Sequence, residues 1–140
     1  MRLFIVLLLI ASQAVAGVAT LTGNGAVKDG DGILFGKVEV RLQGVAAPEM
    51  HDPGGREAKR ALELLIKDSI VTCELDGTLA RKRPVGICYV DGVDVGRALI
   101  KAGFARDCPN FSKGRYSTDE RIAKESGRDL SLTYKLPGYC

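Results

Sequence analysis

The stretch KVEVRLQGVAAPE, residues 37–49, contains the pattern that decides the fold. Charged and apolar residues alternate through its first half, and a period of two is typical of a β-strand with one buried face. The face predicted to be buried carries Val38, Val40 and Leu42. The other face carries Lys37, Glu39 and Arg41. The pattern therefore turns Arg41 away from the core, toward a surface groove.

A helix is predicted beyond Pro48, where the apolar period lengthens to that of an amphipathic helix beginning near Gly55. Its apolar stripe is Ala58, Ala61, Leu62, Leu65 and Ile66. Two strands follow, over residues 70–75 and 85–90. Asp94 is predicted to cap a second helix that stops at Gly103. Its buried stripe is Val95, Ala98, Leu99 and Ala102. A capping box of Ser117 and Glu120 predicts a short third helix ending near Gly127.

Upstream of the first stretch, residues 20–28 and 33–35 read as strands separated by the turn-forming sequence DGDG, residues 29–32. The order is thus three strands, a helix, two strands and then helices. This order predicts an α+β, mainly β fold: a five-stranded, partly open barrel of the OB type with about three packed helices.

The N-terminal residues are typical of an export signal. Arg2 precedes the apolar residues 3–10, and the sequence AVA at residues 14–16 is a small-x-small cleavage site. The apolar run is shorter than the roughly 20 residues that span a bilayer, although an N-terminal membrane anchor is the alternative. We predict a signal peptide over residues 1–16 and a single domain over residues 17–140 with no transmembrane segment. Export would end in a bacterial periplasm or outside the cell.

The four cysteines fit an exported domain with two disulfides, for which three pairings exist. A hairpin folded about residues 77–84 places Cys73 opposite Cys88, close enough for a bond. We therefore predict Cys73–Cys88 and, by elimination, Cys108–Cys140. Two buried thiols in the hairpin are the alternative for a protein that stays in the cytoplasm.

Several motifs, in one order, carry a resemblance to a known family. They are KDGDG at residues 28–32, RLQGVAAPE at 41–49, GREA at 55–58, Arg83 before the strand that ends in YVDG at 89–92, and ALIKAGFA at 98–105. Over about residues 25–130 the chain resembles the staphylococcal nuclease, or thermonuclease, family. Five motifs in a shared order are far more specific than one short match.

The resemblance implies a nuclease that hydrolyses phosphodiester bonds of DNA or RNA with the help of Ca²⁺. Position by position, it implies that Asp31 binds the metal, and Asp29 is a possible further ligand. It further implies that Glu49 is the general base and that Arg41 and Arg83 bind the scissile phosphate. The residue types suit these roles, because a carboxylate can accept a proton from water and a guanidinium can donate two parallel hydrogen bonds to phosphate.

The sequence also departs from the family pattern. Ala46 stands where the family has a metal-binding aspartate, Gly32 stands where it has a threonine, and the loop before Arg83 lacks the usual tyrosine. Because calcium affinity follows ligand charge and number, these changes weaken the expected site. The alternative is a non-catalytic OB-type module that binds single-stranded nucleic acid or polysaccharide.

Two basic loops are candidates for nucleic-acid binding. The first holds Arg81 and Lys82, and the second holds Lys113, Arg115 and Tyr116. With Arg41 they could form a groove in which Tyr116 stacks on a base. The formal net charge is only +3, which does not by itself predict a nucleic-acid partner, and solubilising charges are the alternative. We expect a monomer.

Overall fold

The computed structural model describes residues 17–140, and the signal peptide predicted for residues 1–16 lies outside them. The strands are β1 (Thr20–Asn24), β2 (Ala26–Asp29), β3 (Gly32–Phe35), β4 (Val38–Leu42), β5 (Val45–Ala46), β6 (Ile70–Ala80), β7 (Arg83–Val90), β8 (Val93–Asp94) and β9 (Arg106–Asp107). The helices are α1 (Gly55–Ile66), α2 (Val95–Lys101), α3 (Pro109–Ser112) and α4 (Ser117–Glu125), followed by a 3-10 helix at Leu130–Leu132.

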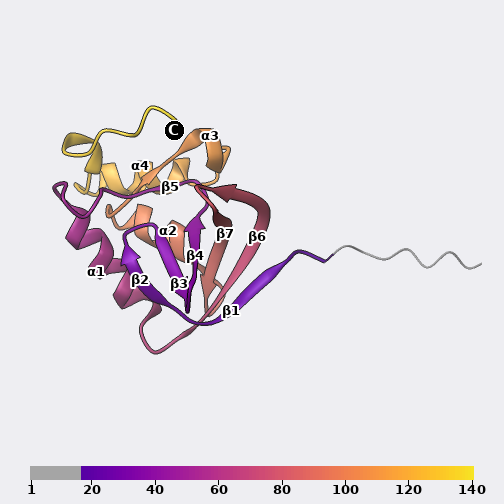
Figure 1. Cartoon of the computed structure of the whole chain (residues 1–140). Helices are drawn as coiled ribbons and strands as arrows, with labels where there is room; N and C mark the ends of the chain where they lie inside the picture. The colour runs from indigo at the N-terminus through magenta and orange to yellow at the C-terminus, as the bar shows by residue number, and fades with distance from the viewer. Residues whose placement is uncertain (1–16) are drawn as a thin grey trace, which may run out of the picture.

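The main sheet is curved, so that two consecutive strands of the chain form its two edges. Its order is β1-β6-β7-β4-β3-β2, with β8 added to β7, while β5 and β9 pair separately. β1 and β2 lie at opposite edges of this order although only Gly25 separates them in the chain. A Cβ at Gly25 would lie 2.7 Å from Ile33 Cγ2, so the bend between the two strands requires glycine. The sheet therefore curls into a half-barrel (Figure 1), which confirms the predicted OB-type α+β fold.

The strand predicted over residues 20–28 is thus two strands with different partners. β1 pairs with β6, and β2 pairs with β3. Sequence alternation alone does not reveal this division, because Gly25 interrupts the strand without changing its polarity pattern. The half-barrel core is formed by side chains from strands and helices alike, including Ile33, Val40, Leu62 and Leu99, all 0% exposed.

The helices lie as the periodicity predicts, with one exception at a cap. α1 packs against β2, and α2 packs against β7 and α4. Asp94 caps α2 by accepting a hydrogen bond from the Arg97 N–H at 3.1 Å, as predicted. The predicted capping box on α4 is wrong: Ser117 is the first helical residue, and its hydroxyl donates to the Gly114 carbonyl instead. α3 was not predicted from the sequence.

Both predicted disulfides are present. Cys73 lies opposite Cys88 in the β6–β7 hairpin, and Cys108 is bonded to Cys140. The hairpin turns at residues 81–82 rather than midway between residues 77 and 84, because the register shifts between Leu75 and Leu79. In the part of the chain that the structure describes, no helix has the length and apolarity needed to cross a bilayer.

Candidate active site

The turn between β2 and β3, which carries Asp31, lies close to α1 and to the segment after β5. The Asp29 carboxylate accepts a hydrogen bond from the Asp31 N–H at 3.3 Å, which closes the turn. A Cβ at Gly30 would lie 2.6 Å from the Ala58 Cβ on α1 and 2.8 Å from the Ala47 Cβ. Glycine at this position therefore allows the turn to approach both elements, so that Asp31 can reach the segment that follows β5.

Asp31 is a largely enclosed acid of the site, with a side chain that is 15% exposed. Its Oδ2 accepts a hydrogen bond from the Ala47 N–H at 3.2 Å and lies 3.2 Å from Arg41 Nη1. Burial raises the pKa of Asp31 to about 6, the Arg41 charge opposes this rise, and the carboxylates of Asp29 and Glu49 add to it. The Asp31 carboxyl thus changes its charge close to neutral pH.

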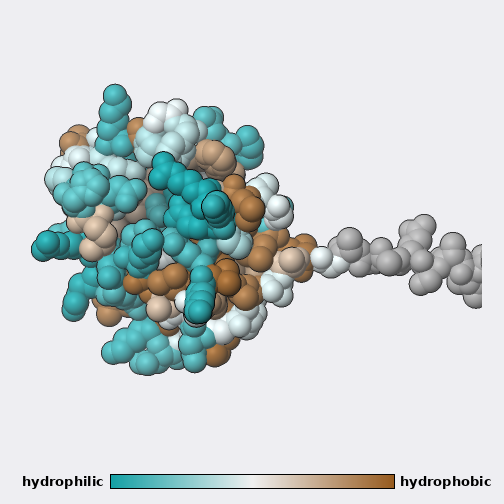
Figure 2. Space-filling model, viewed as in Figure 1, coloured by the Kyte–Doolittle hydropathy of each residue, from teal (hydrophilic) through white to brown (hydrophobic). Residues whose placement is uncertain are grey.

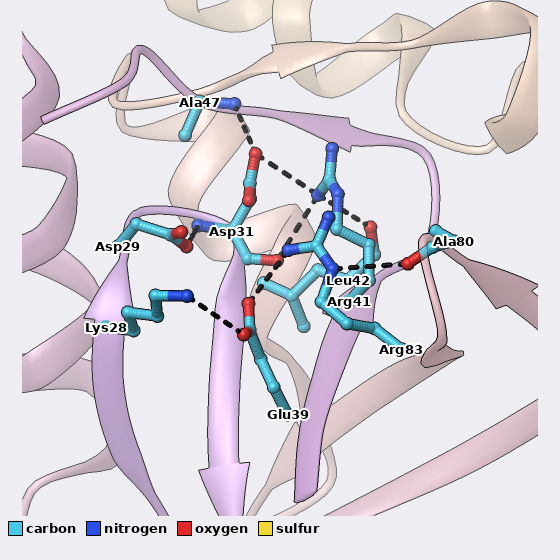
Figure 3. A network of polar contacts seen from close by, with 9 residues as sticks. All are labelled: Lys28, Asp29, Asp31, Glu39, Arg41, Leu42, Ala47, Ala80 and Arg83. Carbon is cyan, nitrogen blue, oxygen red and sulfur yellow. Dashed lines mark hydrogen bonds and ion pairs between the residues drawn. The ribbon is translucent and has the colours of Figure 1, made fainter.

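Arg41 is held in place by the backbone as well as by Asp31. Its Nη1 also donates to the carbonyls of Asp31 and Leu42, at 3.2 Å each. It lies on the face of β4 opposite to Val40 and Leu42, as the alternation predicts, yet its side chain is only 12% exposed. Figure 3 shows the guanidinium directed toward the Asp31 carboxylate.

Arg83 reaches the same region from the start of β7. β4 and β7 are parallel, with Arg41 beside Val85, so the register brings Arg83 beside Glu39. Arg83 Nη1 lies 2.8 Å from Glu39 Oε1, and its Nε donates to the Ala80 carbonyl at 3.3 Å. Burial acts to lower the pKa of Arg83, but the hydrogen bond and charge of Glu39 raise it, and the Asp31 carboxylate adds to the rise.

Glu49 lies at the exposed edge of this region, directly after the buried Pro48. Its carbonyl accepts a hydrogen bond from the Asp52 N–H at 2.9 Å, and a side chain at Gly55 would collide with the Glu49 backbone. The tight loop before α1 therefore fixes the backbone position of Glu49 at the edge of the barrel. Its carboxylate is near enough to Asp31 to raise the pKa of that group.

The structure thus brings the four residues predicted from the family resemblance into one region. Arg41 contacts Asp31 directly, and the charges of Arg83 and Glu49 each interact with Asp31. The most hydrophilic side chains on the face seen in Figure 2 gather over the ends of β4 and β7, near β5. Arg41 and Arg83 therefore lie in one network of polar contacts with Asp31 and Glu39, and guanidinium groups can donate paired hydrogen bonds to a phosphate.

The residues present do not fit a calcium ion at Asp31. Ala46 and Gly32 supply no side-chain oxygen, and the Asp31 carboxylate is already paired with Arg41. Among residues 17–140, no group of three His, Cys, Asp or Glu side chains could hold a metal ion. Calcium dependence stays a prediction, which direct assay must test.

The two basic loops differ in what they expose. Arg81 and Lys82 form the exposed hairpin turn, and Lys113 is exposed after α3. Arg115 is exposed as well, but its guanidinium lies 2.8 Å from the buried Asp94 carboxylate. Tyr116 is 1% exposed and donates its hydroxyl to Asp94 at 3.1 Å. The predicted stacking of Tyr116 on a base does not fit this placement, because the ring is part of the core.

Two residues near the site were not among the sequence predictions for it. Glu39, noted only for its place on the strand face, pairs with Arg83. Tyr134 lies in the C-terminal segment, where its carbonyl accepts a hydrogen bond from Arg106 at 3.2 Å. Burial raises the pKa of Tyr134 to about 12, with further contributions led by the Asp31 carboxylate. No sequence signal pointed to Tyr134, since the segment after Ser131 has no periodicity.

Comparisons with known proteins find similar sequences. The family model described as staphylococcal nuclease homologue matches residues 39–130. The probable staphylococcal-like nuclease CAN1 of Oryza sativa subsp. japonica is 36% identical over 76 residues, which cover 54% of this chain and 23% of that protein. The probable staphylococcal-like nuclease CAN3 of the same plant is 31% identical over 101 residues, which cover 71% of this chain and 27% of that protein. The chain spans about a quarter of the length of these two relatives.

Proposed function

The chain belongs to the staphylococcal nuclease family, and from this premise we propose that it hydrolyses phosphodiester bonds of DNA or RNA. The observation that carries the proposal is that Arg41, paired with Asp31, and Arg83, paired with Glu39, lie in one polar network, with Glu49 exposed directly after Pro48. A module that only binds a ligand has little need for a solvent-exposed carboxylate together with two arginine guanidinium groups.

In the proposed reaction, Arg41 and Arg83 donate hydrogen bonds to the non-bridging oxygens of the phosphate. Their preorganised donors stabilise the negative charge that grows as water attacks phosphorus. Glu49 accepts the proton of that water, since its carboxylate is exposed to solvent at the edge of the site. The bond from phosphorus to the leaving oxygen breaks, and this oxygen takes a proton from solvent. No step in this sequence is assigned to Asp31, whose carboxyl instead sets the charge beside Arg41.

The alternative is a barrel that binds single-stranded nucleic acid or polysaccharide without cleaving it. Ala46 and Gly32 favour this alternative, because both remove an oxygen that the family pattern supplies at the metal site. The exposed Arg81, Lys82 and Lys113 could contact a nucleic-acid backbone in either case.

Cleavage of fluorogenic single-stranded DNA and RNA distinguishes the two functions. The wild-type protein is compared with Glu49→Gln in calcium, in magnesium and in chelator. Glu125→Gln is the matched control, because it makes the same chemical change on an exposed acid of α4. Cleavage that is lost only in Glu49→Gln supports the nuclease. Binding by wild type and Glu49→Gln without cleavage by either supports the alternative, and sensitivity to chelator decides whether calcium takes part.

We also propose that the protein is exported and monomeric. The two disulfides support export, since such bonds persist in oxidising compartments. The signal sequence predicted for residues 1–16 is tested by the N-terminal sequence of the protein purified from its host. Gel filtration of the same sample tests the monomer.

A further inference from the structure

Glu39 occupies a defined position between two cations and a glycine. Its Oε1 lies 2.8 Å from Arg83 Nη1, and its Oε2 lies 3.5 Å from Lys28 Nζ. A Cβ at Gly32 would lie 2.8 Å from Glu39 Oε1, so the carboxylate fills the space that a side chain at position 32 would need. Figure 3 shows this carboxylate beside the Arg83 guanidinium and below the Asp31 turn.

The contact with Glu39 restricts the conformation of the Arg83 side chain. Arg83 is fixed through two donors, Nη1 to Glu39 and Nε to the Ala80 carbonyl. Among residues 17–140, no hydrogen bond is formed by Arg83 Nη2, which leaves its two N–H groups for an anion. The Glu39 side chain is 12% exposed and that of Arg83 is 26% exposed, so water screens this pair less than it screens a surface pair.

We propose that Glu39 is a positioning residue for Arg83, holding the guanidinium so that its Nη2 donors face the phosphate. The proposal rests on the proposed function, because it assigns to Arg83 the role of phosphate ligand. It also gives Gly32 a physical role, since a residue with a side chain there would displace the Glu39 carboxylate. The opposite possibility is that Glu39 competes with the phosphate for Arg83, in which case its removal would strengthen binding.

A double-mutant cycle separates positioning from competition and from a general effect on the fold. The variants are Glu39→Ala, Arg83→Ala and the double variant, assayed for kcat and KM on single-stranded DNA. We expect Glu39→Ala to lower kcat about 10-fold with little change in KM, because a misplaced guanidinium weakens transition-state contacts. In the Arg83→Ala background, the same change should alter kcat less than about twofold, since nothing is left to position.

Three further variants control this experiment. Glu39→Gln keeps an oxygen that can accept from Nη1, and we expect it to recover most of the kcat that Glu39→Ala loses. Lys28→Ala removes only the exposed partner of Glu39, whose side chain is 64% exposed, and should leave kcat within about twofold. Gly32→Ala should lower kcat with Glu39 present and have a smaller effect in Glu39→Ala. Thermal unfolding of every variant confirms that each is folded under assay conditions.

The results distinguish failure of the positioning role from failure of the proposed hydrolysis. Unchanged kcat in Glu39→Ala, tighter DNA binding by it, or an equal loss in the Arg83→Ala background would each overturn the positioning role. If the wild type binds oligonucleotide but does not cleave it, the proposed hydrolysis fails, and the cycle is then read in dissociation constants by the same criteria. If the wild type neither cleaves nor binds, both proposals fail together.

Discussion

Titration of Asp31 should make the free energy of unfolding of this protein depend on pH. Its carboxyl has an ordinary pKa of 3.8 in the unfolded chain and a pKa of about 6 in the native protein, raised mainly by burial. The native state therefore holds this proton more tightly than the unfolded state. Its contribution to stability is fully present below pH 3.8 and is lost as the pH rises through about 6.

The magnitude follows from the two pKa values. One pKa unit corresponds to about 1.4 kcal/mol, so the full shift amounts to about 3 kcal/mol. Between pH 4 and pH 7.5 the wild type should lose about 2 kcal/mol of this contribution, because part of the loss already occurs below pH 4. Asp31→Asn keeps the shape of the side chain but cannot ionise, so its free energy of unfolding lacks this dependence.

Urea unfolding of both proteins at half-unit steps from pH 4 to 7.5 measures the difference. We expect the free energy of unfolding of Asp31→Asn, relative to wild type, to rise by about 2 kcal/mol across this range. All other titrating groups are shared and cancel in the difference. Glu125→Gln, which replaces an acid that is 61% exposed, should show a change below about 0.5 kcal/mol. A difference between wild type and Asp31→Asn that stays level across the range would refute the burial argument.

The other predictions concern metal, phosphate and the C-terminal disulfide. Ala46→Asp adds the missing carboxylate, so calcium should raise its melting temperature more than it raises that of wild type; equal responses would count against a metal site at Asp31. In the Glu49→Gln background, affinity for a single-stranded oligonucleotide should increase as the pH falls through the pKa of Asp31, because protonation of Asp31 removes a negative charge beside the phosphate site. That pKa should be lower than in the wild type, since the Glu49 carboxylate no longer raises it; a dissociation constant that does not change with pH would contradict the prediction. The double variant Cys108→Ser, Cys140→Ser removes the disulfide between residues that are 32 positions apart in the sequence. Its free energy of unfolding, measured in urea, should fall by about 3–4 kcal/mol, because the unfolded chain is no longer constrained by this loop. A loss below about 1 kcal/mol would show that other contacts hold the C-terminal segment.

Local patterns in the sequence were sufficient for much of the barrel. The alternation around Arg41 placed that side chain on the correct face of β4, since a period of two depends only on neighbouring residues. The Cys73–Cys88 pair was also predicted correctly, although the turn lies elsewhere. The shift between Leu75 and Leu79 displaces the turn but leaves the cysteines in register.

The errors arose where a residue has two suitable partners. Ser117 and Glu120 match a capping box, yet the Ser117 hydroxyl donates to Gly114 because the chain turns before the helix begins. Tyr116 sits in a basic loop, which favoured an exposed position, but the buried Asp94 offers its hydroxyl a partner inside the core. Which partner is nearer depends on tertiary packing, and that information is not local.

The pairing of Glu39 with Arg83 could not have been found from either residue alone, because it depends on the parallel register of β4 and β7. That register has a consequence for the whole site. Arg41 and Arg83 are each paired with an acid, Asp31 and Glu39, before any substrate binds. The site therefore has little excess charge with which to attract a nucleic acid from a distance. In the proposed hydrolysis, the contribution of this site therefore comes from donors that are already oriented, which act on the charge of the transition state more than on that of the ground state.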